Sequence, residues 1–219
     1  MIQVTRDQAL AEQDIPFGLV EVHYPAREQW READFWALAE EELAALGRRF
    51  SDYDRKEAFG ENPYYRFFKK FKKTYPVMLQ MESVLFKGRP FPRENPVTGV
   101  AFLLELTTQI LSGTHDIDRL AGPVELFLGT EKEPFPGLRG EEVHTYPGDF
   151  CGRDGEGIIF SEIAGADART CARPESRRVF YPVFGTPGLS GAVITDAMEC
   201  LTRYAQVLAP GAEVEAALL

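Results

Sequence analysis

The order of its sequence patterns constrains the fold of this chain more than any single motif does. Four segments place apolar side chains at the three- and four-residue spacing of amphipathic helices: residues 26–50, 62–75, 77–88 and 100–113. Four later segments are short β-prone runs between glycine and proline turns: residues 124–129, 148–152, 156–163 and 177–185. Residues 189–209 then return to a helical pattern. Helices first, strands later and a helix last predict an α+β fold, in which helices flank a mixed β-sheet core.

A chain of 219 residues is long enough to bury such a core without disulfides or metals. We expect a single domain in three parts. Residues 1–57 hold a first strand (FGLVEVHYP, 17–25) and a helix, residues 58–185 form the core, and residues 186–219 form a C-terminal helix whose last residues fray.

Composition predicts a cytoplasmic protein. No apolar run approaches the ~20 residues that a membrane span requires. The first residues, MIQVTRDQALAEQD, contain no apolar segment typical of a secretory signal. The three cysteines are widely spaced and form no C-x-x-C pair, which favours reduced thiols over disulfides or a zinc site.

Charge is unevenly distributed in a protein with 34 acidic and 24 basic residues. Between Arg48 and Arg93 twelve basic residues face five acidic ones, so this stretch is positive while the rest of the chain is strongly negative. Such asymmetry indicates an anionic partner for one face of the molecule.

The segment RFFKKFKK (66–73) lies inside this basic stretch. With Asn62 as N-cap and Pro63 at the first helical position, its aromatic residues share one helix face with Tyr64 and Tyr75. We therefore expect the phenylalanines to be buried and the lysines to be exposed. The candidates for binding nucleic acid are Arg66, Lys69, Lys70 and Lys73. The alternative is a solvated helix face without a partner.

Common cofactor and nucleophile signatures are absent: the chain has no P-loop, dinucleotide-binding, H-E-x-x-H or G-x-S-x-G motif. The sequence THDID (114–118) offers three potential metal ligands without a second nearby histidine. The loop GLRGEE (137–142) offers backbone N–H groups to an anion, or forms a simple hairpin turn. We predict no cofactor and no bound metal.

Taken in order, several segments resemble one protein family. They are KEAFGENPYYR, KGRPFPRENPV, SGTHDIDRLAGPVELFLG, GLRGEE, YPGDF, GEGIIF and ARTCARPESRRVFYPV. Together they resemble the tRNA-binding, amino-acid-editing domain between modules B-three and B-four of the phenylalanyl-tRNA synthetase beta chain, and most of all its free-standing relatives. The resemblance covers roughly residues 20 to 185.

The resemblance implies an α+β fold and hydrolysis of an amino acid wrongly esterified to tRNA, with tRNA or aminoacyl-tRNA as the partner. No synthetase catalytic module accompanies the domain, so amino-acid activation is not expected. The resemblance places the catalytic role on His115, Glu162 and Asp167. It places substrate binding on Gly113, Arg139, Gly140, Glu141, Arg169 and Thr170.

Several positions depart from the family pattern. The histidine that commonly lies three residues before the D-x-D turn is replaced by Gly113, and His115 lies two residues later. The glutamate of the second site segment corresponds to Ala168, beside Asp167. Two alternatives to trans-editing therefore remain open: a binding module for an amino acid or small polar ligand, and a small metal-assisted hydrolase that uses THDID. The sequence does not predict an oligomeric state.

Overall fold

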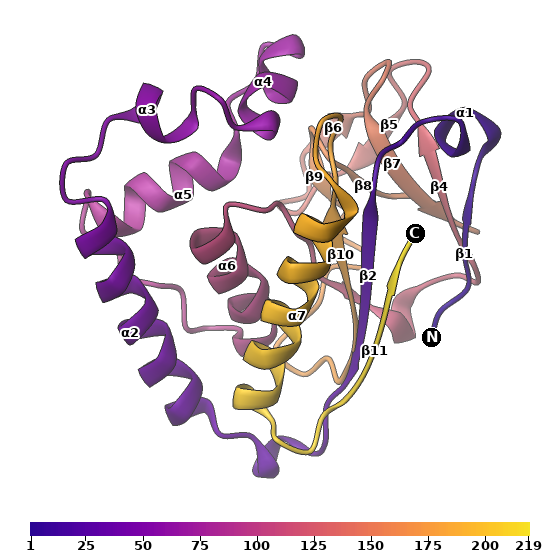
Figure 1. The fold of residues 1–219 in the computed structure, drawn as a ribbon. Helices are drawn as coiled ribbons and strands as arrows, with labels where there is room; N and C mark the ends of the chain where they lie inside the picture. Colours follow the sequence, from indigo (N-terminus) through magenta and orange to yellow (C-terminus); the bar gives the residue numbers. More distant parts are fainter.

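Two sheets and a helical layer make up the protein, whose computed structural model describes residues 1–219 (Figure 1). The helices are α1 (Gln8–Ala11), α2 (Glu32–Arg49), α3 (Arg55–Phe59), α4 (Pro63–Lys70), α5 (Pro76–Leu85), α6 (Pro96–Thr108) and α7 (Gly191–Leu208). The strands are β1 (Val4–Arg6), β2 (Phe17–His23), β3 (His115–Asp116), β4 (Val124–Leu128), β5 (Pro134–Pro136), β6 (Glu142–His144), β7 (Phe150–Asp154), β8 (Gly157–Ser161), β9 (Gly165–Ala166), β10 (Arg178–Phe184) and β11 (Glu213–Leu218). Two short 3-10 turns span Arg27–Gln29 and Ile117–Arg119.

The five-stranded sheet has the order β1-β4-β7-β8-β9 and is mixed, because β1 pairs with β4 in parallel and the other pairs are antiparallel. The four-stranded sheet, β11-β2-β10-β3, is antiparallel throughout, and β5 and β6 form a separate hairpin. The predicted α+β class with a mixed sheet and flanking helices is confirmed. The predicted strands supply only part of the sheets: β1 and β11, from the two ends of the chain, and the short strands β3, β5, β6 and β9 were not predicted.

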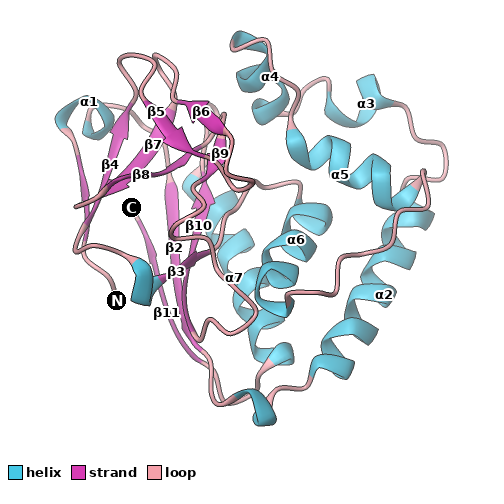
Figure 2. Ribbon diagram, turned by 180° about the vertical axis from the view of Figure 1, so that it is seen from behind, coloured by secondary structure: helices cyan, strands magenta, loops and turns pink.

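Helices α2 to α7 form a layer on one side of the four-stranded sheet, whereas α1 packs on β4 of the five-stranded sheet. Helix α7 packs on β2 and β10, α6 packs beside α7, and α2 contacts both helices from outside. Figures 1 and 2 show this order of layers from opposite sides, with α3, α4 and α5 extending the helical layer at one end. None of the helices combines the length and the apolar composition needed to span a lipid bilayer.

The main hydrophobic core contains 48 buried residues drawn from both sheets and from the helices. Where the two sheets meet, five phenylalanine rings pack with centroids 5.1 to 6.4 Å apart: Phe17, Phe150, Phe160, Phe180 and Phe184. Burying each ring contributes about 1.5–3 kcal/mol, so this cluster fixes the sheets against each other. Two of its rings, Phe160 and Phe184, also line the cavity described below.

Helix α4 begins as predicted but ends early. The Asn62 side chain accepts a hydrogen bond from the Tyr65 N–H, and Pro63 occupies the first turn. Phe67 and Phe68 are buried, but Phe71 is only half-buried because the helix ends at Lys70. The lysines at 69, 70, 72 and 73 are exposed, as predicted.

The early end of α4 has a clear backbone cause. Lys72 adopts the left-handed conformation with φ 57°. The N–H groups of Lys72 and Lys73 bond back to the carbonyls of Lys69 and Phe68, which is the Schellman arrangement that closes a helix. The chain therefore turns at Lys72, which places Lys73 and Thr74 at the wall of the cavity described below.

The C-terminal residues do not fray, contrary to the prediction. They form β11, which pairs with β2 from Glu213 opposite His23 to Leu218 opposite Gly18. The N-terminal amine lies 2.6 Å from a Glu215 carboxylate oxygen, so both ends of the chain are held at this edge. The pairing joins residues about two hundred positions apart, which local sequence patterns do not reveal.

Candidate active site

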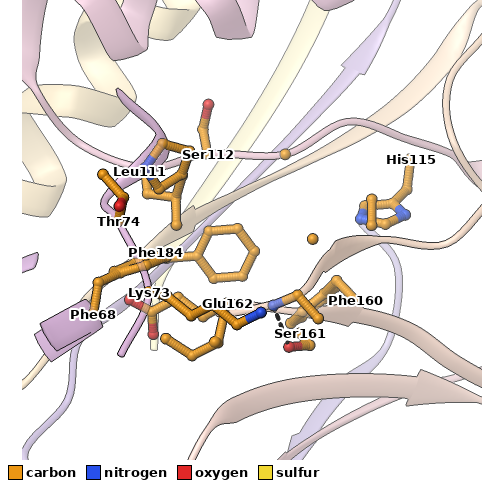
Figure 3. A pocket seen from close by; sticks show the side chains of 16 residues that line it. Phe68, Lys73, Thr74, Leu111, Ser112, His115, Phe160, Ser161, Glu162 and Phe184 are labelled. Carbon is orange, nitrogen blue, oxygen red and sulfur yellow. Dashed lines mark hydrogen bonds between the residues drawn. The ribbon is translucent and has the colours of Figure 1, made fainter. Parts of the chain in front are cut away.

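A cavity of about 230 Å³ lies above the phenylalanine cluster. Its walls come from four segments: the turn after α4, the 111–115 stretch, the end of β8 with the following turn, and the end of β10. Leu111, Phe160 and Phe184 make it largely apolar, while His115, Glu162 and Lys73 supply the titratable groups. Figure 3 shows His115 at one end of the cavity, and Phe68, Lys73 and Thr74 at the other.

Helix α6 ends at Thr108, sooner than predicted, and this early end allows the following residues to carry His115 to the cavity. Gln109 takes the left-handed conformation and caps the helix, and residues 110–113 then run extended toward β10. The Gly113 N–H donates to the Pro182 carbonyl, and His115 pairs with Phe180 in β3. A Cβ at position 113 would lie 3.1 Å from Pro182 and 3.7 Å from the Nε2 of His115, so the absence of a side chain leaves space beside this nitrogen.

The imidazole of His115 is oriented by a buried hydrogen-bond relay. Its Nδ1 lies 2.7 Å from the Thr170 hydroxyl, which also bonds to the Asp167 carboxylate. Because the carboxylate accepts the hydroxyl proton, the Thr170 oxygen accepts from Nδ1–H. His115 Nε2 is then the unprotonated nitrogen, and it is buried without a hydrogen-bond partner.

Burial also fixes the charge of this histidine. The side chain is fully buried, which lowers the pKa of His115 to about 3. Asp154 raises that pKa and Arg169 lowers it, both to a lesser extent than burial. The ring is therefore neutral at physiological pH, and its Nε2 can accept a hydrogen bond from a water or a ligand.

Glu162 is the second buried polar group without a partner at the cavity. Neither carboxyl oxygen has a hydrogen bond, and the residue is 4% exposed. Burial raises the pKa of Glu162 well above its ordinary value, and the nearby Asp149 raises it further. Burial therefore favours the protonated form of Glu162, which can donate a hydrogen bond to a ligand.

Three of the nine predicted catalytic and substrate-binding residues line the cavity: Gly113, His115 and Glu162. Asp167 and Thr170 do not line the cavity: Thr170 bonds to His115, and Asp167 bonds to Thr170. Burial raises the pKa of Asp167, while hydrogen bonds from Thr170 and the charge of Arg169 oppose that rise.

The remaining predicted substrate-binding residues lie outside the cavity lining. Arg169 donates to Asp154 and to the Arg119 carbonyl, so its guanidinium is engaged within the fold. Arg139, Gly140 and Glu141 form the exposed turn of the β5–β6 hairpin. We expected a single concavity that includes these residues, but the hairpin contacts Asp167 only through Gly137, the first residue of its turn, and Arg139, Gly140 and Glu141 do not line the cavity.

The residues predicted to bind nucleic acid are exposed, but they contact different groups of the protein. Arg66 forms an ion pair with Glu61. Lys69 lies 4.3 Å from the centroid of the Tyr65 ring and Lys70 lies 5.9 Å from that of Phe67. Lys73 is the one member of this set that also lines the cavity.

The THDID motif does not assemble a metal site. His115 turns to Thr170, Asp116 accepts from the Ser176 hydroxyl, and Asp118 pairs with Arg178. No group of three or more His, Cys, Asp or Glu side chains in the protein is arranged to hold a metal ion. The alternative of a hydrolase built on THDID therefore lacks its ligand set.

Glu105 was missed by the sequence analysis. It is buried in α6 and accepts hydrogen bonds from the backbone N–H and hydroxyl of Ser112, a residue of the cavity wall. Burial is the largest cause of the rise in the pKa of Glu105 to about 7. The available signal was a lone carboxylate in the apolar run VAFLLELTT.

Comparison with known proteins supports the resemblance on which the sequence analysis relied. The chain is 35% identical over 69 residues to the phenylalanine–tRNA ligase beta subunit of Mycoplasma genitalium, a match that covers 32% of this chain and 9% of that protein. No protein-family model matches the chain. The sequence similarity is thus weak and local.

Structural similarity extends over nearly the whole chain. An N-terminal fragment of the phenylalanyl-tRNA synthetase beta subunit from Pyrococcus horikoshii superposes with a TM-score of 0.50 at 12% identity. The superposition covers 97% of this chain, which spans half of that fragment. At this identity the likeness establishes a shared fold.

Proposed function

We propose that this protein binds tRNA, accepts the aminoacyl end in the cavity beside His115, and hydrolyses the ester in trans. The observation that carries the proposal is the neutral, buried imidazole of His115, whose unpartnered Nε2 faces a cavity in a fold shared with a tRNA synthetase subunit. The three cysteines are unpaired, which suits a reducing compartment, and the proposal places the protein in the cytoplasm.

The cavity suits the side chain of an amino acid. An apolar cavity of ~150 Å³ holds benzene, so a volume of about 230 Å³ leaves room for an aromatic or branched side chain. Phe160 and Phe184 supply apolar walls, and Glu162 supplies one hydrogen-bond donor.

In the proposed reaction, water attacks the carbonyl carbon of the ester and the ribose hydroxyl leaves. His115 Nε2 accepts a hydrogen bond from the attacking water, takes its proton as the tetrahedral adduct forms, and returns that proton to the ribose oxygen as the C–O bond breaks. Thr170 and Asp167 hold the ring in the tautomer that this step requires. Because the pKa of His115 is low, orienting the water is the larger part of its role. The Lys73 ammonium and the Glu162 carboxyl are the candidate donors to the oxyanion.

A binding module without hydrolysis is the second candidate. It is favoured by the placement of Arg169 and of the GLRGEE turn, which contribute nothing to the cavity. In that case His115 and Glu162 hydrogen-bond a ligand that leaves unchanged.

A panel of tRNAs charged with correct and incorrect amino acids separates the two candidates. We expect the protein to release the amino acid from at least one mischarged tRNA, at a rate that a metal chelator does not change. Retention of the same tRNAs without any release would establish the binding module instead. Neither binding nor release from any member of the panel would refute both.

A further inference from the structure

Two lysines from distant parts of the chain meet at one aromatic ring beside the cavity. The ammonium of Lys73, in the turn after α4, lies 5.5 Å from the centroid of the Tyr146 ring. The ammonium of Lys132, in the loop between β4 and β5, lies 5.8 Å from the same centroid. The edge of the Tyr146 ring also packs against Phe71, which fixes the ring relative to α4.

Neither ammonium is neutralised by a carboxylate. Lys73 and Lys132 take part in none of the protein's ion pairs, although the formal charge of the chain is −10. Glu131 and Glu133 flank Lys132 along the chain, yet neither comes within ion-pair distance of it. Four of the twelve basic residues of the Arg48–Arg93 stretch are engaged differently: Arg55, Arg66, Lys87 and Arg93 each pair with a glutamate.

A third lysine adjoins this pair. Lys70 lines a second hollow of about 430 Å³ together with Pro147 and Gly148, the two residues that follow Tyr146. Glu162 borders both this hollow and the cavity beside His115, so the two spaces are neighbours. Uncompensated positive charge is therefore gathered around the turn at Tyr146, next to the mouth of the proposed active site.

We propose that Lys73 and Lys132, positioned by Tyr146, form a binding site for the phosphate groups of a nucleic-acid 3′ end whose terminal group enters the cavity. Lys73 joins the two sites, because it lines the cavity (Figure 3) and its ammonium also lies over the Tyr146 ring. A ligand whose phosphate is covalently linked to a group inside the cavity can occupy the cavity and the two lysines at the same time. A free phosphate can occupy only the lysines. This inference rests on the proposed function, and it names the part of the tRNA that the site recognises.

The test compares two ligands that differ only in phosphate. One is a labelled CCA trinucleotide that carries an amino acid through a 3′-amide, and the other is adenosine with the same amide and no phosphate. The amino acid is taken from the tRNA panel, or is phenylalanine if no tRNA is hydrolysed. Affinities are measured for the wild type, Lys132→Ala, Tyr146→Leu and Lys56→Ala. Lys56 is the matched control, since it is exposed, forms no ion pair and lies on α3, which does not line the cavity.

The wild type should prefer the trinucleotide, with an affinity that falls as salt rises. Lys132→Ala should reduce the preference about three- to tenfold and lower the log–log salt slope by roughly 0.7, the contribution of one phosphate contact to a single strand. Tyr146→Leu should weaken the preference but keep the salt slope, because both charges remain. Lys56→Ala should match the wild type.

If Lys132→Ala and Lys56→Ala lose the preference for the trinucleotide equally, a general electrostatic attraction explains the binding and the inference is overturned. An unchanged preference in Lys132→Ala would also overturn it. Displacement of the trinucleotide by inorganic phosphate as readily as by unlabelled CCA, at matched ionic strength, would overturn its assignment to a nucleic-acid end. The amide is not hydrolysed, so this result is independent of catalysis: a protein that binds as expected but releases no amino acid from tRNA refutes only the hydrolysis.

Discussion

At the scale of single residues, two of the polar groups that the protein buries without hydrogen-bond partners lie at the same cavity. An unsatisfied buried polar atom costs about 1–3 kcal/mol, so such atoms are rare in folded proteins. The Nε2 of His115 and the carboxyl of Glu162 are two of the few in this chain. Their shared location indicates that a ligand or water completes their hydrogen bonds when the site is in use.

Glu105 leads to a prediction about pH and stability. The pKa of Glu105 is raised from 4.5 to about 7 in the folded protein, so folding favours the protonated form. This group imposes no penalty below about pH 4.5, where it is protonated in both states. Between about pH 4.5 and 7 the unfolded chain releases this proton while the folded protein keeps it, so the penalty grows to roughly 3 kcal/mol and levels off above pH 7, where both states are ionised.

The variant Glu105→Gln removes this charge while its amide oxygen can still accept from Ser112. Urea unfolding at pH 5 and pH 8 should show the variant to be more stable than the wild type at pH 8, with a smaller difference at pH 5. Glu199→Gln, an exposed change on α7, serves as the control and should show no such pH-dependent gain. A gain for Glu105→Gln that is the same at both pH values would contradict the explanation.

At the scale of elements, β11 offers a stringent test because its N–H groups alternate between β2 and solvent. Phe17 and Leu219 exchange both backbone hydrogen bonds. In an antiparallel pair such sites alternate, so the N–H of Ala217 points to β2 and that of Ala216 points to the open edge.

Proline at these two neighbouring alanines should therefore have unequal effects. Ala217→Pro removes a donor to β2 and should lower the free energy of unfolding by about 1–3 kcal/mol, whereas Ala216→Pro should be tolerated better. Chemical denaturation of both variants measures the difference. Equal stability of the two would mean that β11 does not pair with β2 as described.

Sequence patterns predicted those elements whose signals are local. The helical periodicity, the strand predicted at 17–25 and observed at Phe17–His23, the N-cap at Asn62 and the first-turn Pro63 all depend on residues close along the chain, and these elements were predicted correctly. The end of α4 was missed because Lys72, and not a glycine, occupies the left-handed position. Strands β1 and β11 were missed because only partners from distant parts of the chain stabilise them.

At the scale of the whole molecule, the site was predictable only in part, because it is assembled from residues that lie far apart in the sequence. His115 and Glu162 were named on the resemblance, and the fold brings them to one cavity. Lys132 and Tyr146 carry no sequence signal, because only the folded chain sets them beside Lys73. The GLRGEE turn offered an anion-binding pattern, yet the sheet geometry holds its tip away from the cavity.

The central claim is that the cavity beside His115 acts on an amino acid esterified to tRNA. The most direct measurement is the rate at which a mischarged tRNA loses its amino acid to the wild type, to His115→Ala, and to His144→Ala, a half-buried histidine outside the cavity. The three proteins should first show the same thermal unfolding. If His115→Ala is unstable, Thr170→Val takes its place, because it removes the hydrogen bond to the His115 imidazole but keeps that ring. We predict that His144→Ala releases the amino acid at the wild-type rate and that the rate of His115→Ala is lower by at least about a hundredfold, the usual contribution of a positioned acid–base group. A folded His115→Ala variant that releases the amino acid as fast as the wild type would contradict it.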